Sequence, residues 1–460
     1  MMTDTIAAIS TAMGESGIGI VRMSGKNSLD IGGKIFKGKI HEDFKDVENR
    51  KLTYGHIYNP KDKKIVDEVL IVYMKSPHTY TREDVVEIYC HGGAISVKKI
   101  LELLLENGAR LAEPGEFTKR AFLNGRLDLS QAEAVIDLIR AKTDKSYDVS
   151  LEQLEGSLSF KIEEIRNILL EMLAHVEVSI DFPDEDIEEV TYEELENSGN
   201  KVLLEIDNLL STADKGRILR DGLNTVILGK PNVGKSSLLN AILRENRAIV
   251  TDVPGTTRDI IEEYVNIDGI PLKIVDTAGI RSTEDLVEKI GVDRAKKVVE
   301  GADLVIGVFD ASRELSLEDK EIIELLKEKN SIVLLNKTDL PNKYNIEDLK
   351  TLIPNKKIIL TAIAKDEGIE ELEETIKNMF YSGDVEVSDE IMITNIRHKN
   401  QLIKAKKNIE EAIEGIKLNV PLDCVEVDIR NCWDNLGEIS GDTISEDILD
   451  KIFSEFCIGK

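Results

Sequence analysis

A glycine-rich segment near the middle of the chain, Gly229-Lys230-Pro231-Asn232-Val233-Gly234-Lys235-Ser236, fits the spacing G-x-x-x-x-G-K-[ST]. It follows an apolar run at 225–228 and precedes a stretch at 237–243 whose pattern predicts a helix. The glycines let backbone N–H groups turn toward phosphate oxygens, and the start of a helix adds positive dipole character. Lys235 would reach the β- and γ-phosphates and Ser236 would bind Mg²⁺. The segment therefore predicts a site for a nucleoside triphosphate.

Two later motifs indicate which nucleotide binds. Asp276-Thr277-Ala278-Gly279 ends an apolar run, where Asp276 could hold Mg²⁺ through water and the Gly279 N–H could meet the γ-phosphate. Asn336-Lys337-Thr338-Asp339 ends the next apolar run but one. Asp339 can accept hydrogen bonds from the N1–H and the 2-amino group of guanine, a donor pair that adenine lacks. This order of motifs resembles the translation-factor-related GTPases, and Thr361-Ala362-Ile363 takes the place of their base-contacting loop.

The groups that would carry out hydrolysis are less clearly marked. In Gly255-Thr256-Thr257-Arg258-Asp259, Thr257 could complete the Mg²⁺ shell only while the γ-phosphate is present; the alternative is a polar turn. Ile280, which follows Asp276-Thr277-Ala278-Gly279, cannot orient the attacking water. Glu288 is the candidate for that role; the alternative is that Glu288 belongs to an exposed helix face. The side-chain carbonyl of Asn232 could hold a monovalent cation, which would stabilise charge developing between the β- and γ-phosphates.

The surrounding elements predict an α/β domain inserted into a helical one. Continuous apolar runs, typical of buried parallel strands, occur at 225–228, 272–275, 304–309, 332–335 and 358–360. Helical patterns lie on either side of them. They cover 146–180, 192–214, 398–416, 422–436 and 446–453, with a capping box expected at Ser130-Gln131-Ala132-Glu133. Strands at 19–23, 53–58, 69–74 and 85–90 and a helix at 94–106 precede them.

The fold class expected is thus α/β and α: an N-terminal mixed α/β domain, a discontinuous helical bundle and an inserted Ras-like P-loop domain. The expected boundaries are 1–121 for the N-terminal domain, 122–215 and 382–460 for the two halves of the helical domain, and 216–381 for the inserted domain.

Composition narrows the class of protein. The chain has 460 residues, about three domains, and 59 Lys+Arg against 87 Asp+Glu give a net charge of −28. This charge disfavours a protein that grips nucleic acid with a broad basic surface. We find no apolar run long enough for a membrane span and no secretory signal. The four cysteines lack metal-type or disulfide spacing, which predicts a cytoplasmic protein.

Segments outside the nucleotide motifs resemble the tRNA modification GTPases of the MnmE (TrmE) family. They are Gly17-Ile18-Gly19-Ile20-Val21-Arg22, 83–87 running to His91-Gly92-Gly93, Pro114-Gly115-Glu116-Phe117 with 121–128, Ile180-Asp181-Phe182-Pro183-Asp184, and the terminal Phe456-Cys457-Ile458-Gly459-Lys460. The resemblance implies an N-terminal domain that dimerises and binds formyl- or methylene-tetrahydrofolate. It also implies a flavin-dependent (FAD) partner, MnmG. With it, the GTPase would place a carboxymethylaminomethyl or aminomethyl group on C5 of the wobble uridine of certain tRNAs.

The same resemblance implies roles for single residues. GTP hydrolysis would be stimulated by K⁺, held by Asn232, Thr251, Val253 and Thr256. Ser236 and Thr257 would hold Mg²⁺, and Glu288 would position the water. Folate would be bound by Arg22, Glu87, Arg126 and Lys460; residue 126 is often Lys in the family, and Arg changes the geometry of that contact. The expected GTP site comprises Asn232, Val233, Gly234, Lys235, Ser236, Ser237, Thr251, Thr256, Thr257, Asp276, Thr277, Ala278, Gly279, Asn336, Lys337, Asp339, Thr361 and Ala362.

Two questions stay open at the level of sequence. Cys457 is either a catalytic nucleophile or a tail residue that packs near the folate pocket; within the motif only Lys460 could lower its pKa. The alternatives to a tRNA-modifying GTPase are an Era-like ribosome-assembly switch and a structural scaffold. An assembly factor would be expected to carry a basic RNA-binding module, whereas Lys34, Lys37 and Lys404 are dispersed among carboxylates.

Overall fold

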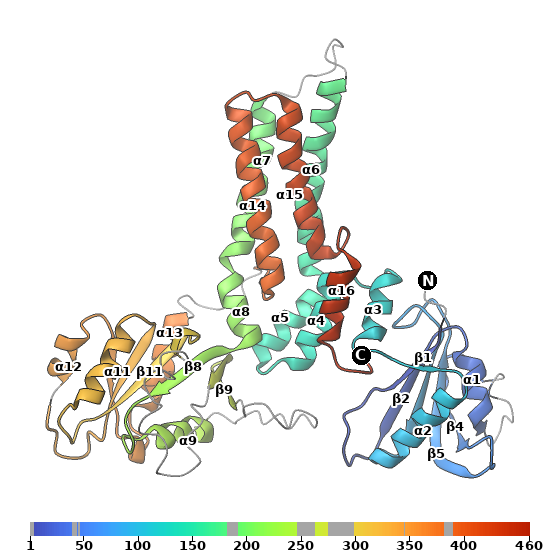
Figure 1. The fold of residues 1–460 in the computed structure, drawn as a ribbon, viewed down its shortest axis with the longest axis horizontal. Coiled ribbons are helices and arrows are strands. Elements are labelled where there is room, and N and C mark those ends of the chain that lie inside the picture. The colour runs from blue at the N-terminus through green and yellow to red at the C-terminus, as the bar shows by residue number, and fades with distance from the viewer. Residues whose placement is uncertain are drawn as a thin grey trace.

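A computed structural model describes residues 4–38, 44, 47–181, 192–245, 263–274, 299–344, 346–380 and 390–460. Figure 1 shows an N-terminal α/β part, a tall bundle of helices and a second α/β part, with the bundle standing between the two. This arrangement confirms the predicted fold class. No helix among the described residues is long and apolar enough to cross a membrane.

The N-terminal part is built on a seven-stranded sheet with the order β3-β4-β5-β6-β2-β1-β7. The strands are β1 (Ile6–Ile9), β2 (Gly19–Ser24), β3 (Phe36–Gly38), β4 (Thr53–Tyr58), β5 (Ile65–Met74), β6 (Val85–Cys90) and β7 (Arg110–Leu111). Helices α1 (Ser28–Ile35) and α2 (Ala94–Glu106) pack on the face that carries Val21 and Ile88. Because side chains alternate along a strand, Arg22 and Glu87 belong to the opposite face.

The helical bundle combines two separate stretches of chain. The first supplies α4 (Leu129–Arg140), α5 (Asp144–Glu155), α6 (Ser157–Asp181) and α7 (Tyr192–Ser211); the second supplies α14 (Ile396–Lys417), α15 (Leu422–Ser440) and α16 (Glu446–Ser454). Leu169, Val202, Ile409 and Ile429 are buried in one common core, so neither stretch could bury its apolar face alone. Helix α3 (Glu116–Leu123) leads from the sheet into the bundle.

Three local predictions in the helical part were wrong. The capping box at the start of α4 is formed by Asp128 and Gln131, because the Asp128 carboxylate accepts from the Gln131 N–H at 3.0 Å and Gln131 Oε1 accepts from the Asp128 N–H at 3.1 Å. The single helix expected over 146–180 is divided at Gly156, whose φ of +102° ends α5. The helix expected over 192–214 ends at Ser211, and α8 (Ala213–Asp221) follows.

The second α/β part has a six-stranded sheet in the order β13-β12-β11-β8-β10-β9. The strands are β8 (Leu223–Leu228), β9 (Glu263–Ile267), β10 (Ile270–Ile274), β11 (Leu304–Asp310), β12 (Ser331–Asn336) and β13 (Lys357–Leu360). Helices α9 (Lys235–Glu245) and α13 (Ile369–Phe380) pack on one face, and α11 (Leu317–Lys327) and α12 (Ile346–Leu352) on the other. The pairings between these strands are parallel except that of β9 with β10, which is antiparallel. Strand β9 lies at the edge of the sheet and was not predicted from the sequence.

Helix α8 joins the bundle to the second sheet. Its first residue, Ala213, is buried in the bundle core, whereas Leu219 is buried under the sheet. Just before α8, the Thr212 hydroxyl donates to the carbonyl of Ile391 at 3.1 Å and accepts from the N–H of Ile393 at 3.1 Å. The chain therefore enters and leaves the inserted part side by side.

The predicted domain limits at 121/122 and 215/216 fall inside α3 and α8. The limit at 381/382 lies outside the described residues, and the exact limits of the domains remain predictions.

A buried ionic cluster closes the bundle where the second stretch of chain returns. The carboxylate of Glu133, on α4, accepts from Arg397 at 2.6 and 2.9 Å, from Asn395 at 3.0 Å and from His398 at 2.7 Å. Burial opposes ionisation of Glu133, but His398 and Arg397 lower its pKa to about 2. Burial lowers the pKa of His398, and its Nε2 lies 2.7 Å from the Glu133 carboxylate.

We expect Glu133→Gln to lower the free energy of unfolding by about 3–5 kcal/mol, because Arg397 would lose its buried counter-charge. Thermal melting followed by far-ultraviolet circular dichroism would measure the loss. The matched control is Glu164→Gln on α6, whose exposed pair with Lys161 contributes little. Since the folded pKa of Glu133 is depressed, its contribution is present above the ordinary value of 4.5 and is lost as the pH falls toward about 2. If Glu133→Gln and Glu164→Gln lowered the free energy of unfolding equally, the stabilising role of the buried Glu133 carboxylate would be contradicted.

Candidate functional site

The loop between β8 and α9, here called the phosphate loop (residues 229–236), has the backbone conformation that a phosphate cradle needs. Asn232 and Gly234 both have positive φ, +64° and +114°. A Cβ on Gly234 would lie 2.3 Å from Nδ2 of Asn336, so only glycine fits. Val233 is buried and anchors the loop, while Ser236 and Ser237 are exposed in the first turn of α9.

The ammonium group of Lys235 lies within the phosphate loop. Its Nζ donates to the carbonyl oxygens of Gly229 at 2.6 Å and Lys230 at 2.7 Å. Burial lowers its pKa. The cation is therefore held against the backbone of the phosphate loop itself.

Asn336, at the end of β12, connects the phosphate loop to the loop that begins at Thr361. Its Nδ2 donates to the carbonyl of Val233 at 2.8 Å, and its Oδ1 accepts from the N–H of Ile363 at 3.2 Å. The next residue, Lys337, donates to the carbonyl of Asn232 at 2.7 Å and to Asp310 at 2.7 Å. Three segments far apart in the sequence are thus brought to one edge of the sheet.

The carboxylate of Asp339 stands at the rim of the same edge, with 22% of its side chain exposed. Thr338 donates to the carbonyl of Thr361 from both its N–H, at 3.2 Å, and its hydroxyl, at 3.0 Å. The Nζ of Lys365 lies 3.6 Å from Oδ2 of Asp339. This ion pair was not predicted, because the base-contacting loop Thr361-Ala362-Ile363 has Ile363 in its third position and no lysine. Thr361 and Ala362 are buried beneath the rim.

Several predicted residues lie outside the part of the chain that the structure describes, and their roles remain predictions. They are Thr251, Val253, Thr256, Thr257, Asp276, Thr277, Ala278, Gly279 and Glu288.

A second group of predicted residues lies on the sheet face of the N-terminal part that α1 and α2 leave uncovered. Arg22 and Glu87 are directly opposite on β2 and β6, and the Arg22 Nε–H donates to Glu87 Oε1 at 2.7 Å. The hydroxyl of Tyr89 donates to the other oxygen, Oε2, at 2.7 Å. Burial and the Glu87 carboxylate raise the pKa of Tyr89 to about 12, so this hydroxyl stays protonated.

Arg126 reaches the same region through Tyr80. Its guanidinium lies 4.6 Å from the centroid of the Tyr80 ring and donates to the Tyr80 carbonyl at 3.1 Å. The Tyr80 hydroxyl is hydrogen-bonded to Thr118 at 2.9 Å. Burial raises the pKa of Tyr80 against the opposing charges of Arg126 and Arg22. Neither Tyr80 nor Tyr89 was predicted, because a single tyrosine in a strand or loop carries no spacing signal.

The last residues of the chain lie against the N-terminal part. The carbonyl of Cys457 accepts from the N–H of Gly115 at 3.3 Å, and that of Lys460 accepts from Phe117 at 3.2 Å. Arg22 in turn stands 5.7 Å from the Phe117 ring. Lys460 thus adjoins the strip formed by Arg22, Glu87 and Arg126, while the Cys457 side chain is exposed. Arg22, Glu87, Arg126 and Lys460 are called the N-terminal site below; their roles remain predictions.

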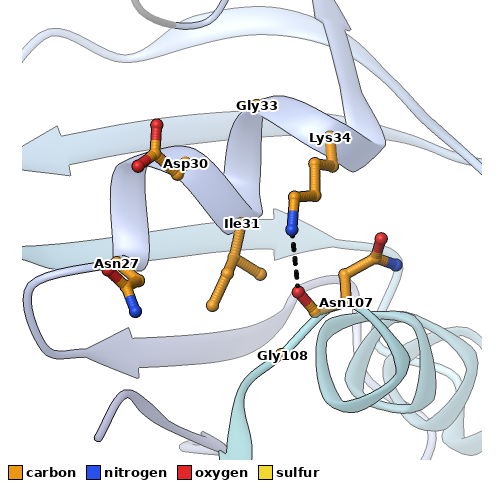
Figure 2. A pocket seen from close by; sticks show the side chains of 7 residues that line it. All are labelled: Asn27, Asp30, Ile31, Gly33, Lys34, Asn107 and Gly108. Carbon is orange, nitrogen blue, oxygen red and sulfur yellow. Dashed lines mark hydrogen bonds between the residues drawn. The ribbon is translucent and has the colours of Figure 1, made fainter.

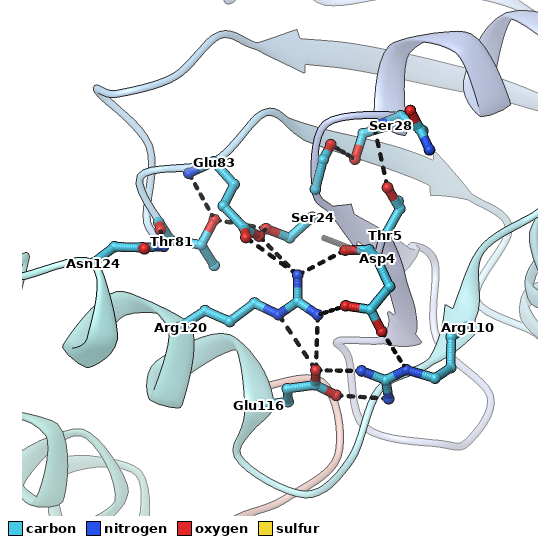
Figure 3. Close-up of polar contacts among 12 residues, drawn as sticks. Asp4, Thr5, Ser24, Ser28, Thr81, Glu83, Arg110, Glu116, Arg120 and Asn124 are labelled. Carbon is cyan, nitrogen blue, oxygen red and sulfur yellow. Dashed lines mark hydrogen bonds and ion pairs between the residues drawn. The ribbon is translucent and has the colours of Figure 1, made fainter. Parts of the chain in front are cut away.

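A buried charge cluster holds α3 in place beside this site (Figure 3). Arg120 is 1% exposed and donates to Glu116 at 2.9 Å, to Asp4 at 2.8 Å and to Glu83 at 3.1 Å. Arg110 adds a bidentate contact to Glu116, at 2.6 and 3.1 Å. The motif residues Glu83 and Glu116 therefore act as structural counter-charges rather than as ligands.

A hollow of about 600 Å³ lies elsewhere, between α1 and the end of α2 (Figure 2). Lys34 crosses it and donates to the carbonyl of Asn107 at 3.1 Å. The described residues that line it include none of those predicted for a site. It opens on the helix-covered side of the sheet, whereas Arg22 and Glu87 belong to the other face.

Comparison with known proteins bears on the whole chain. The family model described as "MnmE helical domain" matches residues 129–457, and "GTP-binding protein TrmE N-terminus" matches residues 5–126. Among solved structures, the FeoB G-domain from Methanococcus jannaschii is 26% identical and covers 34% of this chain and 97% of its own, with a TM-score of 0.25.

Curated relatives match over their full length. The protein named tRNA modification GTPase MnmE from Alkaliphilus oremlandii is 59% identical over 457 residues, 99% of each chain. Proteins of the same name from Alkaliphilus metalliredigens and Clostridioides difficile are 56% identical, over 100% of each chain, and 57% identical, over 99% of each chain. This chain belongs to the family of the tRNA modification GTPase MnmE.

Proposed function

We propose that the chain is a GTP hydrolase that works within an enzyme modifying C5 of the wobble uridine of certain tRNAs. The observation that carries the proposal is the joint presence, over one full-length match, of the N-terminal part, the helical bundle and the nucleotide motifs. An Era-like ribosome-assembly switch would leave the N-terminal site without a role, and no described contact favours it.

Three described residues, Lys235, Ser236 and Asn232, would contact the phosphates and the two metal ions. Lys235 supplies positive charge to the phosphates from inside the phosphate loop. The exposed hydroxyl of Ser236 suits Mg²⁺, a hard cation that prefers oxygen ligands, with Thr257 as the second protein ligand. Mg²⁺, when bound, neutralises charge on the β- and γ-oxygens. Asn232, exposed on the loop, offers an amide oxygen to K⁺ together with Thr251, Val253 and Thr256.

The one-carbon donor in this proposal is formyl- or methylene-tetrahydrofolate, bound at the N-terminal site. The Glu87 carboxylate suits the N–H edge of a pterin, and Arg22, Arg126 and Lys460 suit anionic groups. The partners are a second copy of this chain, the FAD-dependent protein MnmG and tRNA. All four cysteines are free thiols, which supports the predicted cytoplasmic location.

The function is tested by mass spectrometry of tRNA nucleosides from a deletion strain. The wobble uridine should lose its C5 substituent and regain it when this chain is restored; persistence of the substituent without another such enzyme would refute the proposal. Restoring the chain as Cys457→Ser distinguishes the two roles of that thiol. We expect modification to persist, since the side chain of Cys457 is exposed; complete loss would make it the nucleophile.

Base selectivity is tested at Asp339. We expect Asp339→Asn to shift preference from guanosine to xanthosine triphosphate by roughly two orders of magnitude, because an amide can donate to the 2-keto group that replaces the 2-amino group. Hydrolysis assays with both nucleotides measure the shift. Asp366→Asn, which changes an exposed carboxylate next to Lys365 in the chain, should leave selectivity unchanged.

The cation assignment predicts that GTP turnover is faster in K⁺ than in Na⁺ at equal ionic strength, because K⁺ would stabilise charge developing between the β- and γ-phosphates. Steady-state phosphate release measures both rates. Equal rates would count against Asn232 as a cation ligand.

A further inference from the structure

The carboxylate of Glu87 is held at both oxygens by neighbours on the same sheet. Arg22 approaches Oε1 from β2 at 2.7 Å, and the Tyr89 hydroxyl approaches Oε2 from two residues along β6, also at 2.7 Å. Glu87 is 9% exposed as a whole residue and 11% exposed in its side chain. Its orientation is therefore set by two directional contacts rather than by solvent.

These contacts use only part of the accepting capacity of the carboxylate. An ionised carboxylate offers about four lone-pair positions, two on each oxygen. Among the described residues, Glu87 accepts one hydrogen bond on each oxygen. One position on each oxygen is left, which is the arrangement that accepts two parallel N–H donors from a flat ring.

We propose that Tyr89 is a positioning residue for the folate donor: its hydroxyl holds the Glu87 carboxylate so that both remaining lone-pair positions meet the paired N–H donors of the pterin ring. The inference rests on the proposed function, because it assigns the pterin end of the folate to Glu87. Tyr89 acts through Glu87 and makes no contact with the ligand itself.

The ring of Tyr89 is placed by the sheet and not by its hydroxyl. Tyr89 stands opposite Ile20 on β2 and Leu70 on β5 in the strand register. Aromatic and branched cross-strand neighbours of this kind stabilise a sheet through their apolar surface. Tyr89→Phe keeps that surface and removes only the hydrogen bond, so the substitution leaves the fold in place.

The same sheet face supplies a matched control. Tyr54, on β4, also stands opposite Leu70, and its hydroxyl donates to a carboxylate, that of Glu68. Tyr54→Phe therefore removes the same kind of hydrogen bond on a strand that β5 separates from β6, without touching Glu87.

The experiment is calorimetric titration of the full chain and of each variant with 5-formyltetrahydrofolate and, separately, with p-aminobenzoylglutamate, which lacks the pterin. We expect Tyr89→Phe to weaken binding of the folate by roughly tenfold, since a hydrogen bond to a charged group is lost from the carboxylate. Binding of p-aminobenzoylglutamate, GTP turnover and the melting temperature should stay unchanged. Tyr54→Phe should behave as the unsubstituted chain in every assay.

Each other result overturns the inference in a recognisable way. If the unsubstituted chain fails to bind the folate, the proposed folate site fails and the inference with it. If the chain binds folate and Tyr89→Phe binds it equally well, the folate site stands and the positioning role of Tyr89 is refuted. If Tyr89→Phe weakens both ligands alike, or if Tyr54→Phe has the same effect, the hydroxyl acts on the sheet in general and not on the pterin edge.

Discussion

The buried carboxylate of Glu133 is the contact on which the architecture depends. It sits on the first helix of the bundle and receives hydrogen bonds from Asn395, Arg397 and His398, which belong to the chain after it has left the inserted part. Removing the charge of Glu133 or of Arg397 would leave the other charge buried and uncompensated. The hydrogen bonds of Thr212 to Ile391 and Ile393 act at the same point. Together they let a domain of another fold be inserted without opening the bundle.

The same end of the bundle is tied to the N-terminal part by the last residues of the chain (Figure 1). After α16 the backbone of 457–460 hydrogen-bonds to the start of α3, which Arg120 holds on the N-terminal part through the carboxylates of Asp4 and Glu83. The nucleotide edge and the N-terminal site are therefore on different domains, with the bundle between them (Figure 1). Within one chain, a signal between the nucleotide edge and the N-terminal site would have to pass through the bundle.

The charge of the chain acquires a more specific meaning from the packing. Basic side chains along the bundle are paired with carboxylates, as in Lys399 with Asp214, Lys406 with Asp207 and Arg430 with Glu177. These pairs reduce the basic surface that the bundle offers to a tRNA backbone, consistent with the net charge of −28. In the proposed function, much of the phosphate binding falls to the partner protein.

The sequence by itself determined the phosphate loop, the guanine motif, the strands β8, β10, β11, β12 and β13, and the division of the bundle. These follow from local spacing and from apolar periodicity, which are written into neighbouring residues. Only the tertiary structure decided what Glu133, Arg120 and Tyr80 do, because Glu133 pairs with His398, Arg120 with Asp4 and Tyr80 with Arg126, between 46 and 265 residues away along the chain. The hydrogen bond of Tyr89 to Glu87 is local, but the sheet face gives it its role. The cap at Asp128 and the break at Gly156 were missed for a related reason. Two overlapping capping patterns occur at the start of α4. Glu133 takes no part in the cap, because its carboxylate is buried and hydrogen-bonded to Arg397.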